Sequence, residues 1–201
     1  MRTTKFVTWV AGALALGACK SPSEGGSAPA ASAKQRGTEA NPWVIGMSQC
    51  NLAQVEELVA QGIDVLNISP KEAAPLTQPV AEAYKKKIPV IVLDRAVQGD
   101  DYTTFIGADN VKIGREAGKW ALAALGGKGN IVELKGLMTS TPGQDRNKGF
   151  REGLELDKHP DLHVVFEADM QWLEPNARKE MESALTTQKK IDLVYAHNDP
   201  G

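Results

Sequence analysis

The sequence lacks the short motifs that mark the common kinds of enzyme site. It contains no nucleophile elbow, no paired carboxylates spaced for acid and base catalysis, and no zinc motif. Gly126-Gly-Lys-Gly129 lacks the phosphate-loop pattern and is interpreted as an ordinary loop. His159, His163 and His197 have no metal-like spacing with cysteines or acids, so we expect a surface or strand-end role for each. These absences predict a protein that is not an enzyme and that has no cofactor and no metal.

An excess of charge of either sign is also absent. The 201 residues include 23 Lys and Arg and 25 Asp and Glu, a net charge of −2 at pH 7. Residues 1–18 contain Arg2 and Lys5 and no acid, so without them the counts are 21 and 25 and the net charge is −4. A nucleic acid partner favours a basic surface, which argues against one here. The composition, 42% hydrophobic and 24% charged, is that of one or two ordinary globular domains.

Long hydrophobic runs and cysteines are scarce. The apolar run Phe6–Leu16, after a basic start, is too short for a comfortable transmembrane helix and is typical of an export signal. Leu16-Gly-Ala-Cys19 resembles a bacterial lipobox, which implies cleavage after residue 18 and diacylation of the Cys19 thiol as a membrane anchor. A plain secretory signal is the alternative. Once Cys19 is acylated, only Cys50 remains as a free cysteine, so we expect no disulfide and a buried, inert thiol at Cys50.

The rest of the chain divides by composition and by periodicity. Residues 19–42 are rich in Ser, Gly, Ala and Pro and predict a flexible tether. Strand and helix signals then alternate, the pattern of a parallel α/β sheet, in two sets that predict an N-terminal lobe at 43–107 and a C-terminal lobe at 108–201. Predicted strands are Trp43–Ser48, Val65–Ser69, Val90–Leu93, Thr103–Gly107 (a strand or a connector), Asn130–Leu134, His163–Ala168 and Leu193–Ala196.

Apolar residues at helical spacing predict a helix in most of the intervals between strands. Pro79 is tolerable only in the first turn of its helix. Thr141-Pro-Gly-Gln144 has the capping-box spacing, with proline at the first helical position, and opens a helix that runs to about Leu156. One predicted helix face consists of Ile113, Ala117, Trp120, Ala121 and Ala124.

The most informative run is Ile88-Pro-Val-Ile-Val-Leu-Asp94-Arg95, a short strand that places an adjacent acid and base at its carboxyl end, where open α/β sheets bind ligands. Five other segments accompany it: Ile45–Asn51, Ile68–Leu76, Phe105–Asn110, Asp145-Arg146 with Gly149-Phe150, and Tyr195–Pro200. In this order, the six segments resemble those of the type I periplasmic sugar-binding proteins, among them ribose and galactofuranose binders. The resemblance implies two Rossmann-like parallel-sheet lobes that close on one sugar.

The sequence departs from this family in two places. Asn51 runs directly into a helix where the family inserts a further helix and strand, so one βαβ unit is shortened. Residues 49–64 can still span a right-handed crossover, and the first strand becomes a sheet edge. The family also continues beyond the residues that match Tyr195–Pro200. Both lobes are therefore expected to be incomplete.

A sugar site needs planar charged groups for paired hydrogen bonds and an aromatic ring for stacking. Asp94 can accept from two hydroxyls and Arg95 can donate a fork, and the resemblance implies this role for both. A strand-end salt bridge is the alternative. Arg146, in the first turn of its helix against the dipole, matches a family arginine that reaches the ligand; otherwise it pairs with Asp145 or Glu152.

Three further candidates carry open alternatives. Asn198 matches a binding amide or caps a following helix. Trp172 is a stacking ring or packs locally under a loop. Asn51, with Gln49, matches polar positions after the first strand, although the shortened unit changes their geometry.

The resemblance implies the solute-binding component of a sugar ABC transporter. Such a protein would be exported, anchored to the membrane by lipid and monomeric, and would deliver a monosaccharide to an inner-membrane permease by binding without covalent chemistry. A periplasmic sugar sensor is one alternative. A shortened remnant that binds no ligand is the other.

Overall fold

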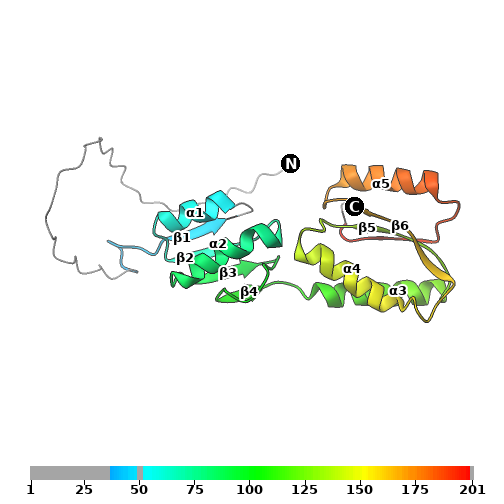
Figure 1. Cartoon of the computed structure of the whole chain (residues 1–201), viewed down its shortest axis with the longest axis horizontal. Helices are drawn as coiled ribbons and strands as arrows, with labels where there is room; N and C mark the ends of the chain where they lie inside the picture. The colour runs from blue at the N-terminus through cyan, green and yellow to red at the C-terminus, as the bar shows by residue number, and fades with distance from the viewer. Residues whose placement is uncertain (1–36, 49–51, 200–201) are drawn as a thin grey trace. The chain divides into compact units, whose positions relative to one another are not determined.

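The structure, a computed structural model, describes residues 37–48 and 52–199, which belong to one compact unit (Figure 1). The predicted export signal, Cys19, Cys50 and the candidates Gln49 and Asn51 lie outside these residues, as does most of the predicted tether. In its last part, the Gly37 and Thr38 N–H groups donate to the Asn41 carbonyl and close a turn. No helix in 37–48 or 52–199 is long and apolar enough to cross a membrane.

Strands and helices alternate as the sequence predicts, with most boundaries within two residues of their expected positions. β1 begins at Ile45 and not at Trp43, whose side chain is 62% exposed. Thr103–Gly107 contains a strand rather than a connector. The described elements are β1 (Ile45–Ser48), α1 (Leu52–Ala60), β2 (Val65–Ile68), α2 (Ala73–Lys85), β3 (Val90–Leu93), β4 (Thr104–Ile106), α3 (Asn110–Leu125), β5 (Gly129–Lys135), α4 (Thr141–Leu154), β6 (Leu162–Asp169), α5 (Glu174–Thr187) and β7 (Leu193–Ala196).

The first lobe is built on the parallel sheet β1-β2-β3-β4, with β1 at an edge as expected. Val55 of α1 and Leu76 of α2 share one apolar core with Leu66 and Val90 of the sheet, so both helices cover the same face. On the opposite face, the β1 side chains Ile45 and Met47 are 57% and 67% exposed. This sheet is covered by described helices on one side only.

The second lobe is built on the parallel sheet β6-β5-β7. α3 and α4 pack on one face, where Phe150 and Leu154 meet Ile131 of β5. α5 packs on the other face, where Ala177 meets Val132. Figure 1 shows the two layers of helices on either side of the strands of this lobe. The α/β fold class with two parallel sheets is therefore confirmed.

The predicted apolar face of α3 is only partly buried. Ala121 lies in the core and Ala117 packs against it, but Ile113 and Trp120 are 43% and 68% exposed, and the buried residues of α3 include Gly114 and Gly118. A Cβ on Gly114 would lie 2.1 Å from the carbonyl oxygen of Arg146 in α4. The two backbones can touch only because glycine stands there, and a count of apolar side chains does not reveal this.

Two predictions about helix starts are wrong. α2 begins at Ala73, so Pro79 lies inside the helix and not in its first turn; its ring is buried, and this apolar contact offsets the missing hydrogen bond. Ser140, and not Thr141, is the N-cap of α4, and it makes no side-chain capping bond. The Thr141 hydroxyl instead accepts the Ala96 N–H from the first lobe at 2.9 Å.

Candidate functional site

The described residues at the carboxyl ends of β3, β6 and β7 meet at one cavity of about 220 Å³. Its lining includes all five described candidates; Asn51 is not among the described residues. Two hydrogen bonds join the segments around the cavity: the Ala96 N–H donates to the Thr141 hydroxyl, and the Ala73 N–H donates to the Thr139 carbonyl at 3.1 Å. The lining residues are Asp94, Arg95, Pro142, Arg146, Trp172 and Asn198.

Asp94 and Arg95 leave β3 in a strained turn. Asp94 has φ 63°, a conformation that non-glycine residues adopt rarely and that tends to occur at functional sites. The Arg95 Nε lies 3.7 Å from the Asp94 carboxylate, a loose ion pair rather than a hydrogen bond. Arg95 Nη1 also donates to the Lys71 carbonyl at 3.4 Å. Both side chains therefore retain hydrogen-bonding capacity that a ligand could use.

Arg146 is held by two other elements of the second lobe. Its Nε donates to Asn110 Oδ1 at 2.9 Å, and its Nη1 donates to the carbonyl oxygen of His197. The alternative partner Glu152 instead binds Arg115 at 2.6 Å. Arg146 is the sixth residue of α4, beyond the first turn, so the predicted cost against the helix dipole does not apply.

Asn110 is a residue of the site that sequence reasoning missed. It lies in the segment Phe105–Asn110 that carried the family resemblance, but nothing in that pattern indicates a contact with Arg146. Its side chain is 6% exposed, and its amide group also donates to the Ala108 carbonyl at 3.2 Å. Asn110 thus fixes the guanidinium without lining the cavity.

Trp172 lies between the two arginines. The guanidinium carbons of Arg95 and Arg146 are 5.9 and 5.6 Å from its ring centroid, within the range of cation–π contacts. The indole packs directly over Gly136, where an added Cβ would lie 2.0 Å from the ring. Trp172 also has a left-handed backbone, with φ 63°. The ring therefore lies near both guanidinium groups of the cavity and also packs on the backbone at Gly136, so its role as a stacking ring stays a prediction.

Two buried polar atoms of the cavity have no hydrogen-bond partner among the described residues. These are Trp172 Nε1, a donor, and Asn198 Oδ1, an acceptor. Buried polar atoms are nearly always satisfied, and an exception needs an explanation. A ligand with hydroxyl groups could satisfy both, because a hydroxyl donates and accepts.

The titratable groups near the cavity differ in their surroundings. Burial raises the pKa of Asp145, which precedes Arg146, and the nearby Asp109 adds to the effect while Lys148 opposes it. His197 is 4% exposed, so the expected strand-end role holds for it and the expected surface role is wrong. No cluster of His, Cys, Asp and Glu in residues 37–48 and 52–199 could hold a metal ion.

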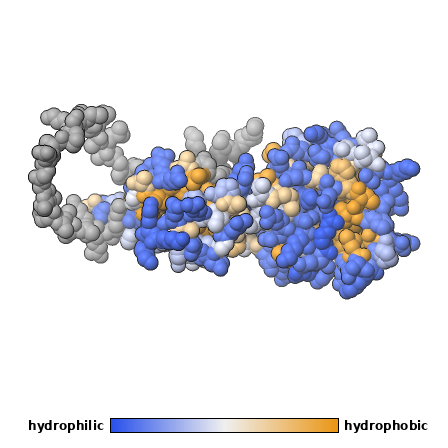
Figure 2. All heavy atoms as spheres, viewed as in Figure 1, coloured by the Kyte–Doolittle hydropathy of each residue, from blue (hydrophilic) through white to orange (hydrophobic). Residues whose placement is uncertain are grey.

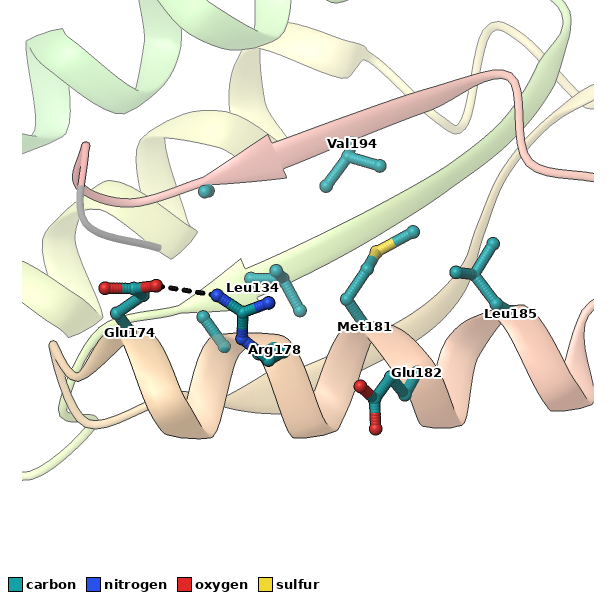
Figure 3. A pocket seen from close by; sticks show the side chains of 9 residues that line it. Leu134, Glu174, Arg178, Met181, Glu182, Leu185 and Val194 are labelled. Carbon is teal, nitrogen blue, oxygen red and sulfur yellow. Dashed lines mark hydrogen bonds and ion pairs between the residues drawn. The ribbon is translucent and has the colours of Figure 1, made fainter.

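A larger cavity of about 450 Å³ lies elsewhere in the second lobe, between α5 and β7. Figure 3 shows Met181 and Leu185 of α5 beside Val194 of β7, with Glu174 and Arg178 paired to each other at the rim at 2.8 Å. In Figure 2, apolar residues gather in a band across the visible face of this lobe. A groove with few polar groups offers little to sugar hydroxyls, so we assign the candidate site to the smaller cavity.

Comparison with known proteins shows the family. Residues 51–201 match the family described as periplasmic binding protein domain. The galactofuranose-binding protein YtfQ of Escherichia coli K12 is 34% identical over 152 residues, 72% of this chain and 47% of that protein. The ribose import binding protein of Haemophilus influenzae is 26% identical over 148 residues, 74% of this chain and 50% of that protein. The chain spans about half the length of the curated relatives it matches.

Solved structures that resemble this chain are also those of sugar-binding proteins. The fructose-binding periplasmic domain of the hybrid two-component system BT1754 is 39% identical, with a TM-score of 0.73 over 78% of this chain and 64% of that one. A galactofuranose-binding protein is 32% identical, with a TM-score of 0.68 over 74% of this chain and 52% of that one. The chain therefore belongs to the family of type I periplasmic sugar-binding proteins.

Proposed function

We propose that this protein binds a monosaccharide or a similar small polyol in the cavity formed by Asp94, Arg95, Arg146, Trp172 and Asn198. One observation carries the proposal: a carboxylate, two guanidinium groups, an indole and an amide, from three strand ends and from helix α4, line one small cavity. The volume, about 220 Å³, lies below the range of drug-sized pockets, as suits a single sugar.

Each lining group has a task that fits a sugar. The Asp94 carboxylate accepts from two neighbouring hydroxyls, and the guanidinium groups of Arg95 and Arg146 donate to hydroxyl or ring oxygens. The Trp172 ring stacks on an apolar face of the sugar. Hydroxyl groups of the sugar supply hydrogen-bond partners for the Trp172 Nε1 and for the Asn198 Oδ1. The work is binding alone, so the protein is not an enzyme on this proposal.

The names of the relatives narrow the choice of probes. They include binders of galactofuranose, ribose and fructose, and a xylitol-binding protein of Mycolicibacterium smegmatis that is 32% identical over 148 residues. In this proposal the chain is exported, is anchored through Cys19 and delivers its sugar as a monomer to an inner-membrane ABC permease. Furanose-forming sugars and short polyols are the first ligands to try.

A sugar sensor is the second candidate. The likeness to the periplasmic domain of a hybrid two-component system, at 39% identity, favours it directly. The same cavity would serve, because ligand binding shifts the population of lobe arrangements whether a permease or a receptor reads the result. Pull-down of a permease or of a sensor kinase by the sugar-loaded protein would distinguish the two roles.

The binding proposal is tested by a thermal melt of the purified protein with D-ribose, D-galactose, D-fructose and xylitol. A ligand present at about 100 times its Kd should add about 2.7 kcal/mol to the free energy of unfolding and raise the Tm. Asp94→Ala should weaken binding by about 10- to 100-fold, because it removes charge-assisted hydrogen bonds. Asp100→Ala, which removes an exposed acid from the loop after β3, is the matched control. If no probe shifts the Tm of the wild-type protein, the alternative of a remnant without a ligand is favoured.

A further inference from the structure

The second lobe contains a buried pair of titratable groups that does not line the cavity. Glu133 lies in β5, the central strand, and His197 follows β7; both side chains are fully buried. His197 Nε2 lies 3.0 Å from Glu133 Oε1. A buried ionised carboxylate is costly unless it is paired and hydrogen-bonded, so this arrangement calls for a reason.

The contacts of His197 determine where its proton lies. The Gly136 N–H donates to His197 Nδ1 at 3.1 Å, and a backbone N–H can only donate. Nδ1 must therefore be unprotonated, and Nε2 carries the hydrogen that it donates to Glu133 Oε1. The imidazole is thus fixed as one neutral tautomer between the end of β5 and the Glu133 carboxylate.

Glu133 has further partners on α4. Asn147 Nδ2 donates to Oε1 at 3.0 Å, and Arg151 Nη2 donates to Oε2 at 2.9 Å. Burial pushes the pKa of Glu133 upward, but the hydrogen bonds from His197 and Asn147 and the charge of Arg151 outweigh it, and the net shift is downward. The carboxylate therefore stays ionised near neutral pH, and both of its oxygens are used.

Two residues that bind Glu133 are direct chain neighbours of cavity residues. Asn147 adjoins Arg146 in α4, and His197 adjoins Asn198. The His197 carbonyl also accepts from Arg146 Nη1. One buried carboxylate thus connects, through single residues, to the guanidinium and the amide on the second-lobe side of the cavity.

We propose that Glu133 and His197 are positioning residues that set the placement of Arg146 and Asn198 for sugar binding. The inference rests on the proposed function. The pair does not touch the ligand; it fixes the backbone at residue 197 and the turn of α4 at residue 147, from which the two binding side chains project. Apolar residues of similar size would fill the same space without the desolvation cost, so packing alone does not account for the pair.

A double variant separates positioning from packing. Glu133→Met with His197→Leu replaces both groups by apolar side chains of roughly similar size and leaves Arg151 its second partner, Glu167. This variant should fold, with cooperative unfolding, and should bind the best of D-ribose, D-galactose, D-fructose and xylitol at least tenfold more weakly in calorimetry. The single variant Glu133→Gln should weaken binding to a similar extent if it folds. In either orientation, its amide NH2 group faces a side chain that donates to Glu133 in the wild-type protein.

Leu154→Ala is the matched control, because it opens a cavity in the core of the same lobe at a residue with 0% exposure and away from the site. Its Kd should stay within about threefold of the wild-type value. Nitrogen NMR of the wild-type protein should show His197 protonated at Nε2 alone, and the Arg146 Nε–H resonance should shift in the double variant but not in Leu154→Ala.

The outcomes are distinct. Weakened binding in the folded double variant, with the control unaffected, supports the positioning role. Unchanged binding in that variant, or an Nδ1-protonated His197 in the wild-type protein, overturns it while the proposed function stands. A wild-type protein that binds none of the four probes refutes the proposed function, and the positioning role falls with it.

Discussion

The two lobes differ in how their sheets are covered, and strand order explains the difference. In the first lobe each new strand adds on the same side, giving the order β1-β2-β3-β4. Because nearly all parallel crossovers are right-handed, strands added in one direction carry their connecting helices on one face. In the second lobe β6 and β7 lie on opposite sides of β5, so α4 and α5 cover opposite faces. For the described helices, strand order thus accounts for which faces of each sheet are covered.

The lobes also differ in how they hold their share of the site. Among the described residues, the first-lobe core is apolar, and its contribution to the cavity is the strained turn at Asp94. The second lobe holds Arg146 and Asn198 through a hydrogen-bonded network centred on buried Glu133. A lobe with helices on both faces can bury such a network away from water. The first lobe, where the described helices cover only one face of the sheet, has less depth in which to do so.

The largest expected effect comes from placing one lysine on each kind of sheet face. Val132→Lys puts a charge on the face of β5 that α5 covers, at a residue with 0% exposure, and should cost more than about 4 kcal/mol or prevent folding. Met47→Lys puts the same charge on the bare face of β1 and should change stability by less than about 0.5 kcal/mol. Urea unfolding followed by circular dichroism measures both.

The Met47→Lys variant also tests whether the sheet face that no described helix covers promotes self-association. Parallel sheets are almost always covered on both faces, so the bare face should be prone to self-association. Met47→Lys should therefore reduce light scattering in concentrated solution. A loss of stability from Met47→Lys as large as that from Val132→Lys would show that the first sheet is covered after all.

The sequence predicted those features that depend on local pattern. The position of Asp94 and Arg95 at a strand end followed from a single apolar run. The place of β1 at a sheet edge followed instead from the family resemblance, which implies that a neighbouring strand is missing here. The meeting of the Asp94-Arg95 pair with Arg146, Trp172 and Asn198 followed from the family resemblance, since nothing local connects segments so far apart. Asn51 stays a prediction, because it lies outside the described residues.

What the sequence did not predict depends on contacts across the fold. The glycine face of α3 is invisible to a search for apolar side chains, because the contact there is between backbones. His197 has no metal-like spacing, and that reasoning could not reveal its partner Glu133, 64 residues away in the chain. Thr141 has the spacing of a cap, but its hydroxyl accepts from Ala96 in the other lobe. Local patterns identified the elements, and packing decided the roles.

Acid should weaken the second lobe more than the first. The lowered pKa of Glu133 means that the unfolded chain binds its proton more tightly than the native state does. Its contribution to stability is therefore fully present above the ordinary carboxyl value of 4.5 and is lost as the pH falls through the lower native pKa. Urea unfolding between pH 7 and 3 measures this loss. The stability difference between wild type and Glu133→Gln should shrink as the pH falls, and a constant difference would contradict the assignment.

At high pH, stability should fall because of a group in the same lobe whose native pKa is raised and not lowered. Burial raises the pKa of Tyr195 from 10.0 to about 12, with the charge of Glu133 adding and that of Arg146 opposing. Between these two values the native state keeps a proton that the unfolded chain has lost, so the free energy of unfolding should fall as the pH rises from 10 to 12. Tyr195→Phe should remove this part of the decline, as urea unfolding across that range would show.

Only a small effect on stability is expected at the first-lobe part of the site, which depends on backbone strain and not on a network. Asp94→Gly relieves the left-handed backbone at φ 63°, while the freer unfolded chain offsets part of the gain. The loose ion pair with Arg95 adds little, because Asp94 is mostly exposed. Stability should therefore rise by no more than about 1 kcal/mol, while the affinity for the sugar falls about 10- to 100-fold.

Asp94→Asn is the matched control, since asparagine tolerates the same backbone and lacks only the charge. Equal binding losses in both variants, with a stability gain only in Asp94→Gly, would show that the strained backbone lowers the stability of the first lobe and orients the Asp94 carboxylate for binding. A destabilised Asp94→Gly would show instead that the Asp94 side chain, like Glu133 in the second lobe, holds its surroundings together.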